Sequence, residues 1–371
     1  MIINAIGIIN NTQKDDFFKE ITKNRSLASV PTGGKYRMID FPLSNLVNSG
    51  VQNVGILVQS RYGSLMDHLR AGKEWGLARK RDGLYILPYS MNDHTNFSRG
   101  TLENFYNNFE YLRKSRREYA IITGTNVICN MDYTKAFEQH IATGADITVI
   151  YNNPVKDVDA NHYAVLELDK KGKVTAIEAV PVSIKSNHVS MEMYIIKKDL
   201  LVTTVETCVA RGEYDFVRDL LVKYATTLNI YGYKHEGYVA RINSLQGYFS
   251  HNMALLKPTV WKELFFEPGR IYTKIKDSAP TKYLMHAQTK NALISDGCVI
   301  DGEIEDSIIS RGVTIKKGAR IKNCIIMEKC VIEENVVLEN VILDKLVHIT
   351  EDKRLIGVPE YPVLVEKKVT I

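Results

Sequence analysis

Residues 307–323, SIISRGVTIKKGARIKN, are followed without a gap by two segments of the same length and pattern. These segments are 324–340, CIIMEKCVIEENVVLEN, and 341–357, VILDKLVHITEDKRLIG. Aligned at a period of 17, all three carry apolar residues at the second, third, ninth and fifteenth positions. The inward positions within each segment therefore lie six residues apart. This hexapeptide spacing is typical of coils that stack into a left-handed parallel β-helix.

The repeats define the C-terminal part of the chain. A single coil cannot bury its own apolar edge, so neighbouring coils must stack. We therefore expect a β-helix over residues 291–371, with NALISDGCVIDGEIED as its first, irregular coil. The alternative is a β-sandwich with coincidental spacing, which three aligned repeats disfavour. The open edge of a coil stack favours association between chains, so self-association is a further expectation.

Upstream of the repeats, short apolar runs alternate with amphipathic stretches. Strands are expected over residues 2–9, 53–58, 119–123, 145–151, 164–168, 174–179, 191–196 and 228–233, and helices over 44–50, 64–70, 102–114 and 133–143. Strands separated by helices indicate a mostly parallel sheet with crossover connections. The sequence thus predicts a doubly wound α/β, Rossmann-like domain over residues 1–250. A connector over 251–290, helical in 251–266, would join it to the β-helix.

Composition limits the classes of partner. The chain has 371 residues and a net charge of +5, a mild basic bias that fits a site for small anions as well as nucleic acid. No run approaches the roughly 18 apolar residues of a membrane helix, and MIINAIGIIN suits a strand better than a signal peptide. Five cysteines without CxxC spacing predict buried thiols in a reducing cytoplasm. We expect a cytoplasmic protein without nucleic-acid or membrane partners.

The stretch VPTGGKYRMIDFPLSNLVNSG, residues 30–50, is the most informative for chemistry. Gly33 and Gly34 predict a tight turn whose backbone N–H groups can meet an anion, and Lys35 and Arg37 follow as cations. Taken alone, the stretch also fits a basic surface turn that leads into a helix.

Several blocks of the chain resemble the bacterial glucose-1-phosphate adenylyltransferase (ADP-glucose pyrophosphorylase) family. They are GGKYRMIDFPLSN, RGTLENFYNN, NMDY, KSNHVSMEMYII and DFVRDLL, and the family also ends in a β-helix. The resemblance covers essentially the whole chain. It implies a nucleotidyltransferase domain that joins ATP and glucose 1-phosphate into ADP-glucose with Mg²⁺, for glycogen or starch synthesis.

The departures from this family fall on groups that touch phosphate or metal. Only Gly7 remains of the glycine-rich nucleotide loop, and Leu27 stands where the family has a phosphate-binding lysine. Thr125 and Gln246 stand in place of two metal-binding aspartates, and Val180 in place of the sugar-phosphate lysine. Such catalysis rests on positioning and charge neutralisation, and neutral side chains cannot offset Mg²⁺ as carboxylates do.

These departures narrow the resemblance to the regulatory, GlgD-type subunits of the family. Because the neighbouring blocks persist, the pattern indicates a retained fold with a disabled active site, a pseudoenzyme. The resemblance then implies assembly with a catalytic GlgC-type subunit, as a heterotetramer. It implies no catalytic residue, metal ligand or cofactor on this chain, and Mg²⁺ on the catalytic partner.

Some positions keep features of ligand sites. Arg25 and Arg37, with Lys35 beside them, match an allosteric phosphate site that lies between the two domains of catalytic relatives. A solvated basic loop is the open alternative. Gly100 and Thr101 keep the outline of a nucleotide-binding loop.

Three other functions remain open. An active adenylyltransferase with a shifted metal site needs two acids at the carboxyl edge of the sheet, and Asp40 and Asp132 are the candidates. A sugar-phosphate sensor would bind its ligand without a partner. The hexapeptide repeats alone suggest an acyltransferase, but His348 is the sole histidine of residues 291–371. His188 is expected to be a packed, hydrogen-bonded histidine.

Overall fold

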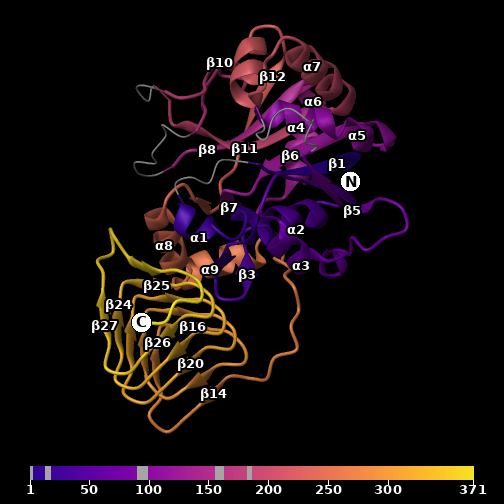
Figure 1. Ribbon diagram of the computed structural model, residues 1–371. Coiled ribbons are helices and arrows are strands. Elements are labelled where there is room, and N and C mark those ends of the chain that lie inside the picture. The colour runs from indigo at the N-terminus through magenta and orange to yellow at the C-terminus, as the bar shows by residue number, and fades with distance from the viewer. Residues whose placement is uncertain (1–2, 13–17, 90–98, 155–162, 182–185) are drawn as a thin grey trace.

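The computed structural model describes residues 3–12, 18–89, 99–154, 163–181 and 186–371. An α/β domain forms the N-terminal part, and a stack of flat coils forms the C-terminal part (Figure 1). None of the helices in these ranges combines the length and apolar composition needed to cross a bilayer.

A nine-stranded sheet is the centre of the α/β domain. Its strands run β10-β9-β11-β6-β1-β4-β5, and β8 pairs with both β11 and β12. The bounds are β1 (Ala5–Asn11), β4 (Asn53–Val58), β5 (Gly83–Pro88), β6 (Tyr119–Gly124), β8 (Ile147–Asn152), β9 (Val165–Leu168), β10 (Val174–Glu178), β11 (His188–Lys197) and β12 (Ile230–Lys234). Strands β6, β1, β4 and β5 are parallel to one another, whereas β11 is antiparallel to β6, β8 and β9.

Helices cover both faces of this sheet, which confirms the doubly wound arrangement. One face packs against α2 (Asp40–Asn48), α3 (Gly63–Leu69) and α6 (Tyr133–Thr143). The other packs against α4 (Thr101–Asn107), α5 (Phe109–Lys114), α7 (Lys198–Ala210) and the π-helical η5 (Phe216–Val222). Successive residues of β1 alternate between the two cores, as a pleated strand buried on both faces requires.

Two local expectations are wrong. The helix expected over 102–114 is divided into α4 and α5 at Asn108, whose φ of −113° and ψ of 17° are not helical. Strand β5 is not among the expected strands, and it ends at Pro88, a residue type that is rare inside sheets. The structure accommodates Pro88 because β5 is the edge strand of the sheet.

Short elements surround the sheet on the side of the β-helix. They are α1 (Lys19–Thr22), η2 (Leu27–Ser29), β2 (Pro31–Thr32), β3 (Tyr36–Arg37), η3 (Lys73–Trp75), β7 (Val127–Cys129) and β13 (Val239–Arg241). The connector contains two helices, α8 (Leu245–Ala254) and α9 (Pro258–Phe266), so its first helix begins before the expected boundary at residue 251. Ser244 sets that beginning, because its hydroxyl accepts a hydrogen bond from Gly247 N at 2.9 Å.

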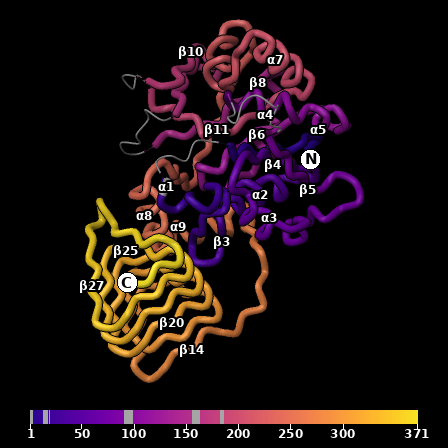
Figure 2. Tube along the Cα trace, viewed as in Figure 1, coloured from indigo at the N-terminus to yellow at the C-terminus, as the bar shows by residue number. Residues whose placement is uncertain are grey.

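The C-terminal domain is a left-handed β-helix of five coils with three strands each. The strands are β14 (Lys282–Tyr283), β15 (Gln288–Lys290), β16 (Leu293–Ile294), β17 (Val299–Ile300), β18 (Glu303–Glu305), β19 (Ile308–Ile309), β20 (Thr314–Ile315), β21 (Arg320–Lys322), β22 (Ile325–Ile326), β23 (Val331–Ile332), β24 (Val337–Glu339), β25 (Val341–Leu343), β26 (His348–Ile349), β27 (Arg354–Ile356) and β28 (Val363–Val365). Figure 2 shows the successive coils stacked on one another.

The first coil begins earlier than the sequence predicted. Lys282 and Gln288 already pair in parallel with the next coil, so the stack starts before residue 291. The 17-residue register is confirmed, since Ile304, Ile321 and Leu338 lie directly above one another in the core.

The two domains share an apolar core. Leu27 and Phe265 belong to the same buried cluster as Ile325, Met327 and Ile342 of the β-helix. Contact continues at the turn after β2, where a Cβ added to Gly34 would lie 2.7 Å from Ser295 Oγ. The α/β domain is thus seated on one face of the coil stack.

Candidate functional site

The carboxyl ends of β1 and β6 form the edge where doubly wound sheets bind ligands. Asn10 of β1 pairs in register with Gly124 of β6, and Thr125 and Asn126 follow. A cavity of about 130 Å³ opens here, lined by Asn10, Thr101, Phe105, Ile122, Gly124, Glu192, Tyr194, Asp215, Phe216 and Val217.

This cavity is small and lacks cations. Ligand pockets usually measure about 300–1,000 Å³, several times the 130 Å³ found here. Its described lining contains two carboxylates, Glu192 and Asp215, and neither lysine nor arginine. The described lining of this cavity therefore lacks the positive charge that a triphosphate cradle needs.

Thr125 is fully buried. Its hydroxyl has no hydrogen-bond partner among the described residues. The neighbouring Asn126 is held from both sides: its Nδ2 donates to Glu192 Oε2 at 2.9 Å, and its carbonyl accepts from Ile242 N at 2.8 Å. Asn126 therefore links the end of β6 to β11 and to the segment after β13 by hydrogen bonds.

The residues at the two expected metal positions do not fit Mg²⁺. Thr125 is neutral and buried, and Gln246 is a neutral, exposed side chain in the first turn of α8. Mg²⁺ is usually held through carboxylate oxygens. Across the described ranges, no group of three or more His, Cys, Asp or Glu side chains is arranged to hold a metal ion.

The two acids considered for a shifted metal site have structural roles instead. Asp40 is buried, accepts from Arg37 N at 2.9 Å and contacts His68 Nε2 at 2.6 Å. Asp132 caps α6 by accepting from Thr134 N at 2.9 Å. Neither lines the cavity, so neither residue supports the alternative of a shifted metal site there.

Sequence reasoning missed the acids that do line the cavity. Glu192 has a φ of 55° and lies where the β11 register shifts between Ser190 and Met193. Asp215 caps η5, with its carboxylate accepting from Val217 N at 2.9 Å and Arg218 N at 2.7 Å. The one signal for Glu192 was a charge inside an otherwise buried strand, because a bulge cannot be read from side-chain alternation.

The structure does not bring the three residues expected from the nucleotide loop, Gly7, Gly100 and Thr101, together at the cavity. Gly7 lies inside β1 and not in a loop, and a Cβ there would lie 2.8 Å from Leu46 Cδ1. Gly100 precedes α4, where a Cβ would collide with the Tyr214 carbonyl oxygen. Of the three expected residues, Thr101 alone lines the cavity.

The two positions that carry lysine in the family hold no cation here. Leu27 is buried in η2, within the apolar cluster shared by the two domains. Val180 is 59% exposed and follows the end of β10. Both side chains are aliphatic, so neither can neutralise a phosphate.

The candidate effector residues lie at the domain boundary, but they differ in environment. Arg25 is buried and forms an ion pair with Asp344 of the β-helix. Arg37 is buried and its Nη1 donates to the Ser64 carbonyl at 2.7 Å. Lys35 is exposed, with its ammonium 5.4 Å from the centroid of the Tyr36 ring.

Further charges complete an interdomain cluster of Arg25, Arg37, Lys276, Glu328, Asp344 and Lys345. Glu328 accepts from Lys276 Nζ at 2.7 Å and Lys345 Nζ at 2.8 Å. Burial raises the pKa of Glu328, but the attraction of Lys345 and Lys276 outweighs it and brings that pKa to about 2. Burial, and then repulsion by Arg37, lowers the pKa of Lys345 to about 8. Asp40 and Asp67 also act on Arg37, so the four cations of the cluster lie near four carboxylates.

Comparison with known proteins agrees with this architecture. A nucleotidyl transferase profile matches residues 18–257, and a GlmU-like C-terminal hexapeptide profile matches residues 279–361. The chain therefore belongs to the nucleotidyl transferase family and carries a C-terminal hexapeptide β-helix.

Full-length relatives place it more closely. The glycogen biosynthesis protein GlgD of Bacillus subtilis (strain 168) is 35% identical over 98% of this chain and 95% of its own length. GlgD of Geobacillus stearothermophilus is 36% identical over 85% of this chain and 82% of its own. The glucose-1-phosphate adenylyltransferase of Fervidobacterium nodosum is 32% identical over 87% of this chain and 78% of its own. The chain belongs to the glucose-1-phosphate adenylyltransferase family, in the group that includes the GlgD proteins.

Proposed function

We propose that this chain is a regulatory, non-catalytic subunit of glucose-1-phosphate adenylyltransferase, which forms ADP-glucose and diphosphate from ATP and glucose 1-phosphate. The proposed setting is glycogen biosynthesis in the cytoplasm. One observation carries the proposal: the carboxyl edge of the sheet holds a cavity of about 130 Å³ whose described lining contains no lysine or arginine, beside a buried threonine hydroxyl. The family keeps its phosphate and metal chemistry at this edge.

The proposed partner is a catalytic GlgC-type subunit, in a heterotetramer. Mg²⁺ and both substrates would be bound by that subunit, and this chain would bind no cofactor of its own. Regulation then acts through the interface between subunits. It requires that this chain contact the active and inactive states of its neighbour with different free energies.

The test is ADP-glucose formation with ATP, glucose 1-phosphate and Mg²⁺. The purified chain alone is expected to show no turnover above the blank. Added to a purified catalytic subunit of the same organism, it is expected to change that subunit's kcat or KM. Turnover by the lone chain would contradict the non-catalytic assignment, and an unchanged partner would contradict the regulatory one.

A second candidate, an active adenylyltransferase with an altered metal site, draws support from Glu192 and Asp215. These carboxylates line one cavity at the carboxyl edge. If the lone chain forms ADP-glucose, the variants Glu192→Gln and Asp215→Asn test whether these two carboxylates are the metal ligands. Loss of turnover in both variants would support the altered site, whereas retained turnover would exclude these acids as its ligands.

The effector residues are part of the same proposal. Arg25, Lys35 and Arg37 are proposed to contribute to an anion site at the domain boundary. The convergence of Arg25, Arg37 and Lys345 at the domain boundary supports this role. The Asp344 carboxylate already neutralises Arg25, so we expect a phosphate to contact Arg37 and Lys35 more readily than Arg25.

A further inference from the structure

A second cavity lies at the opposite edge of the sheet. It measures about 750 Å³ and is bounded by Asn4, Asn53 and Asp82, which stand at the amino-terminal ends of β1, β4 and β5. Because family chemistry belongs to the carboxyl edge, this groove is separate from the candidate active site.

Two basic segments distant in sequence line this groove. Lys80 and Arg81 come from the turn before β5, and Lys114, Arg116 and Arg117 come from the end of α5 and the loop after it. With Asp82 and Glu110 also in the lining, five cations face two carboxylates. The groove therefore has a net positive charge, which raises the local concentration of anions.

Three of these cations are available to a ligand. Arg117 pairs with Asp82 at 2.8 Å, and Lys114 pairs with Glu110 at 2.7 Å. Lys80, Arg81 and Arg116 are exposed, and none of the three has an ion-pair partner among the described residues. Three unpaired cations at one groove match a ligand that carries more than one negative charge.

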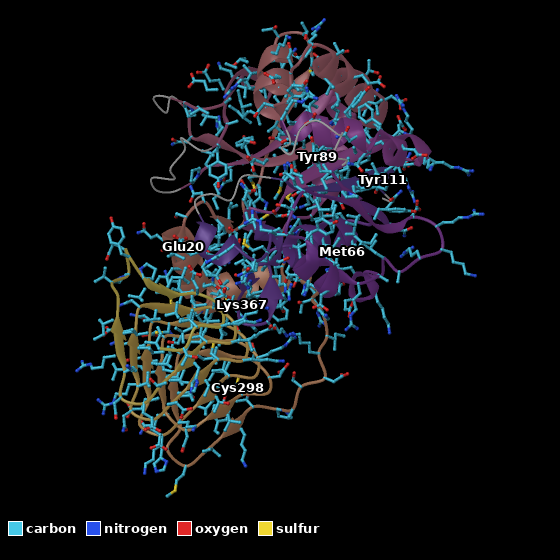
Figure 3. The ribbon with its side chains drawn as sticks, viewed as in Figure 1. Glu20, Met66, Tyr89, Tyr111, Cys298 and Lys367 are labelled. Atoms are coloured by element: carbon cyan, nitrogen blue, oxygen red, sulfur yellow. The ribbon has the colours of Figure 1, made fainter. Side chains whose placement is uncertain are left out.

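The floor of the groove is aromatic. Tyr111, labelled in Figure 3 beside the β5 edge, is fixed because its hydroxyl donates to Asn53 Oδ1 at 2.8 Å. Tyr85 of β5 packs on it with ring centroids 5.1 Å apart, yet remains 43% exposed. An exposed ring held by a fixed neighbour offers a platform for a planar group, because stacking then costs little side-chain entropy.

We propose that this amino-edge groove binds a nucleoside phosphate, with the base against Tyr85 and the phosphates among Lys80, Arg81 and Arg116. Its volume lies within the range of about 300–1,000 Å³ found for small-molecule sites. Binding here is independent of the carboxyl edge, so it would hold whether or not the chain is catalytic.

The test is isothermal titration of the full chain with ADP, without Mg²⁺ and at low ionic strength. Wild type is expected to bind one ADP. The triple variant Lys80→Gln, Arg81→Gln, Arg116→Gln is expected to bind it about tenfold or more weakly, as the loss of three exposed charge contacts implies. The triple variant Lys170→Gln, Lys171→Gln, Lys353→Gln removes the same charge elsewhere and should bind as wild type does.

The tyrosine separates a nucleotide site from a simple anion site. Tyr85→Ser should weaken ADP binding but leave pyrophosphate binding unchanged, and Tyr85→Phe should retain both. Circular dichroism melts of each variant establish that it is folded. The proposal is overturned if wild type does not bind ADP, if the groove variant and the control bind alike, or if Tyr85→Ser leaves ADP binding unchanged.

Discussion

Removing the carboxylate of Asp344 is expected to destabilise the whole protein through the domain boundary. Asp344 and Arg25 form an ion pair across 319 residues of sequence, and their side chains are only 2% and 4% exposed. Arg25 Nε also donates to the Ile21 carbonyl at 2.9 Å, so the guanidinium cannot move to solvent without breaking a second contact. In Asp344→Ala, this cation stays buried without its counter-charge.

The magnitude follows from the burial. Breaking a buried ion pair on one side typically costs about 3–5 kcal/mol of unfolding free energy. Arg25→Ala, Asp344→Ala and the double variant form a cycle, measured by urea denaturation and circular dichroism. We expect the double variant to lose less than the sum of the single losses, with a coupling of about 0.5–3 kcal/mol. The reason is that it leaves no unpaired charge.

A second ion pair between the α/β domain and the β-helix provides a matched control. Lys23 and Glu366 also join the domains, at 2.9 Å, but their side chains are 63% and 46% exposed. Glu366→Ala should therefore cost less than about 1 kcal/mol. Equal losses in Asp344→Ala and Glu366→Ala, or strictly additive losses around the Arg25–Asp344 cycle, would refute the reasoning from burial.

Three further predictions follow from other contacts. The pKa of Glu328 is about 2 in the folded chain against 4.5 ordinarily, so the unfolded chain binds more protons between these values. Stability should fall by roughly 3 kcal/mol as pH drops through that window, and acid titration of Glu328→Gln should flatten the fall. Gly7→Ala should cost about 1–3 kcal/mol in urea denaturation, because its Cβ would lie 2.8 Å from Leu46; an unchanged midpoint would contradict this. Thr125→Val should match or exceed wild type in thermal stability, because a buried unpartnered hydroxyl is replaced by a methyl group, and a large loss would reveal an unseen hydrogen bond.

Much of the fold could be predicted because it is written in local periodicity. Helix α6 spans Tyr133–Thr143 and strand β4 spans Asn53–Val58, both as the pattern indicates. Where the local sequence pattern is ambiguous, strands were missed or their bounds differ from the expected ones. Strand β5, which ends at Pro88, was missed, and the first coil of the β-helix was hidden because Lys282 and Tyr283 are exposed and carry no apolar repeat.

The candidate site was only half predictable. The sequence shows which chemical groups are missing at positions such as Thr125 and Leu27, since side-chain identity needs no structure. It does not show what surrounds them. Glu192 lines the cavity because of a bulge in β11. Asp132 caps α6, and Asp40 contacts His68, so the carboxylates of both candidate acids have structural partners.

The sequence by itself determined the two domains, the 17-residue register of the β-helix and the neutral side chains at positions 27, 125, 180 and 246. These properties depend on residue type and on spacing along the chain. The tertiary structure alone decided that Arg25 meets Asp344 and that two basic segments converge on the groove beside Tyr85. The physical reason is that such contacts join segments far apart in sequence, and only the packing of strands, helices and coils brings those segments together.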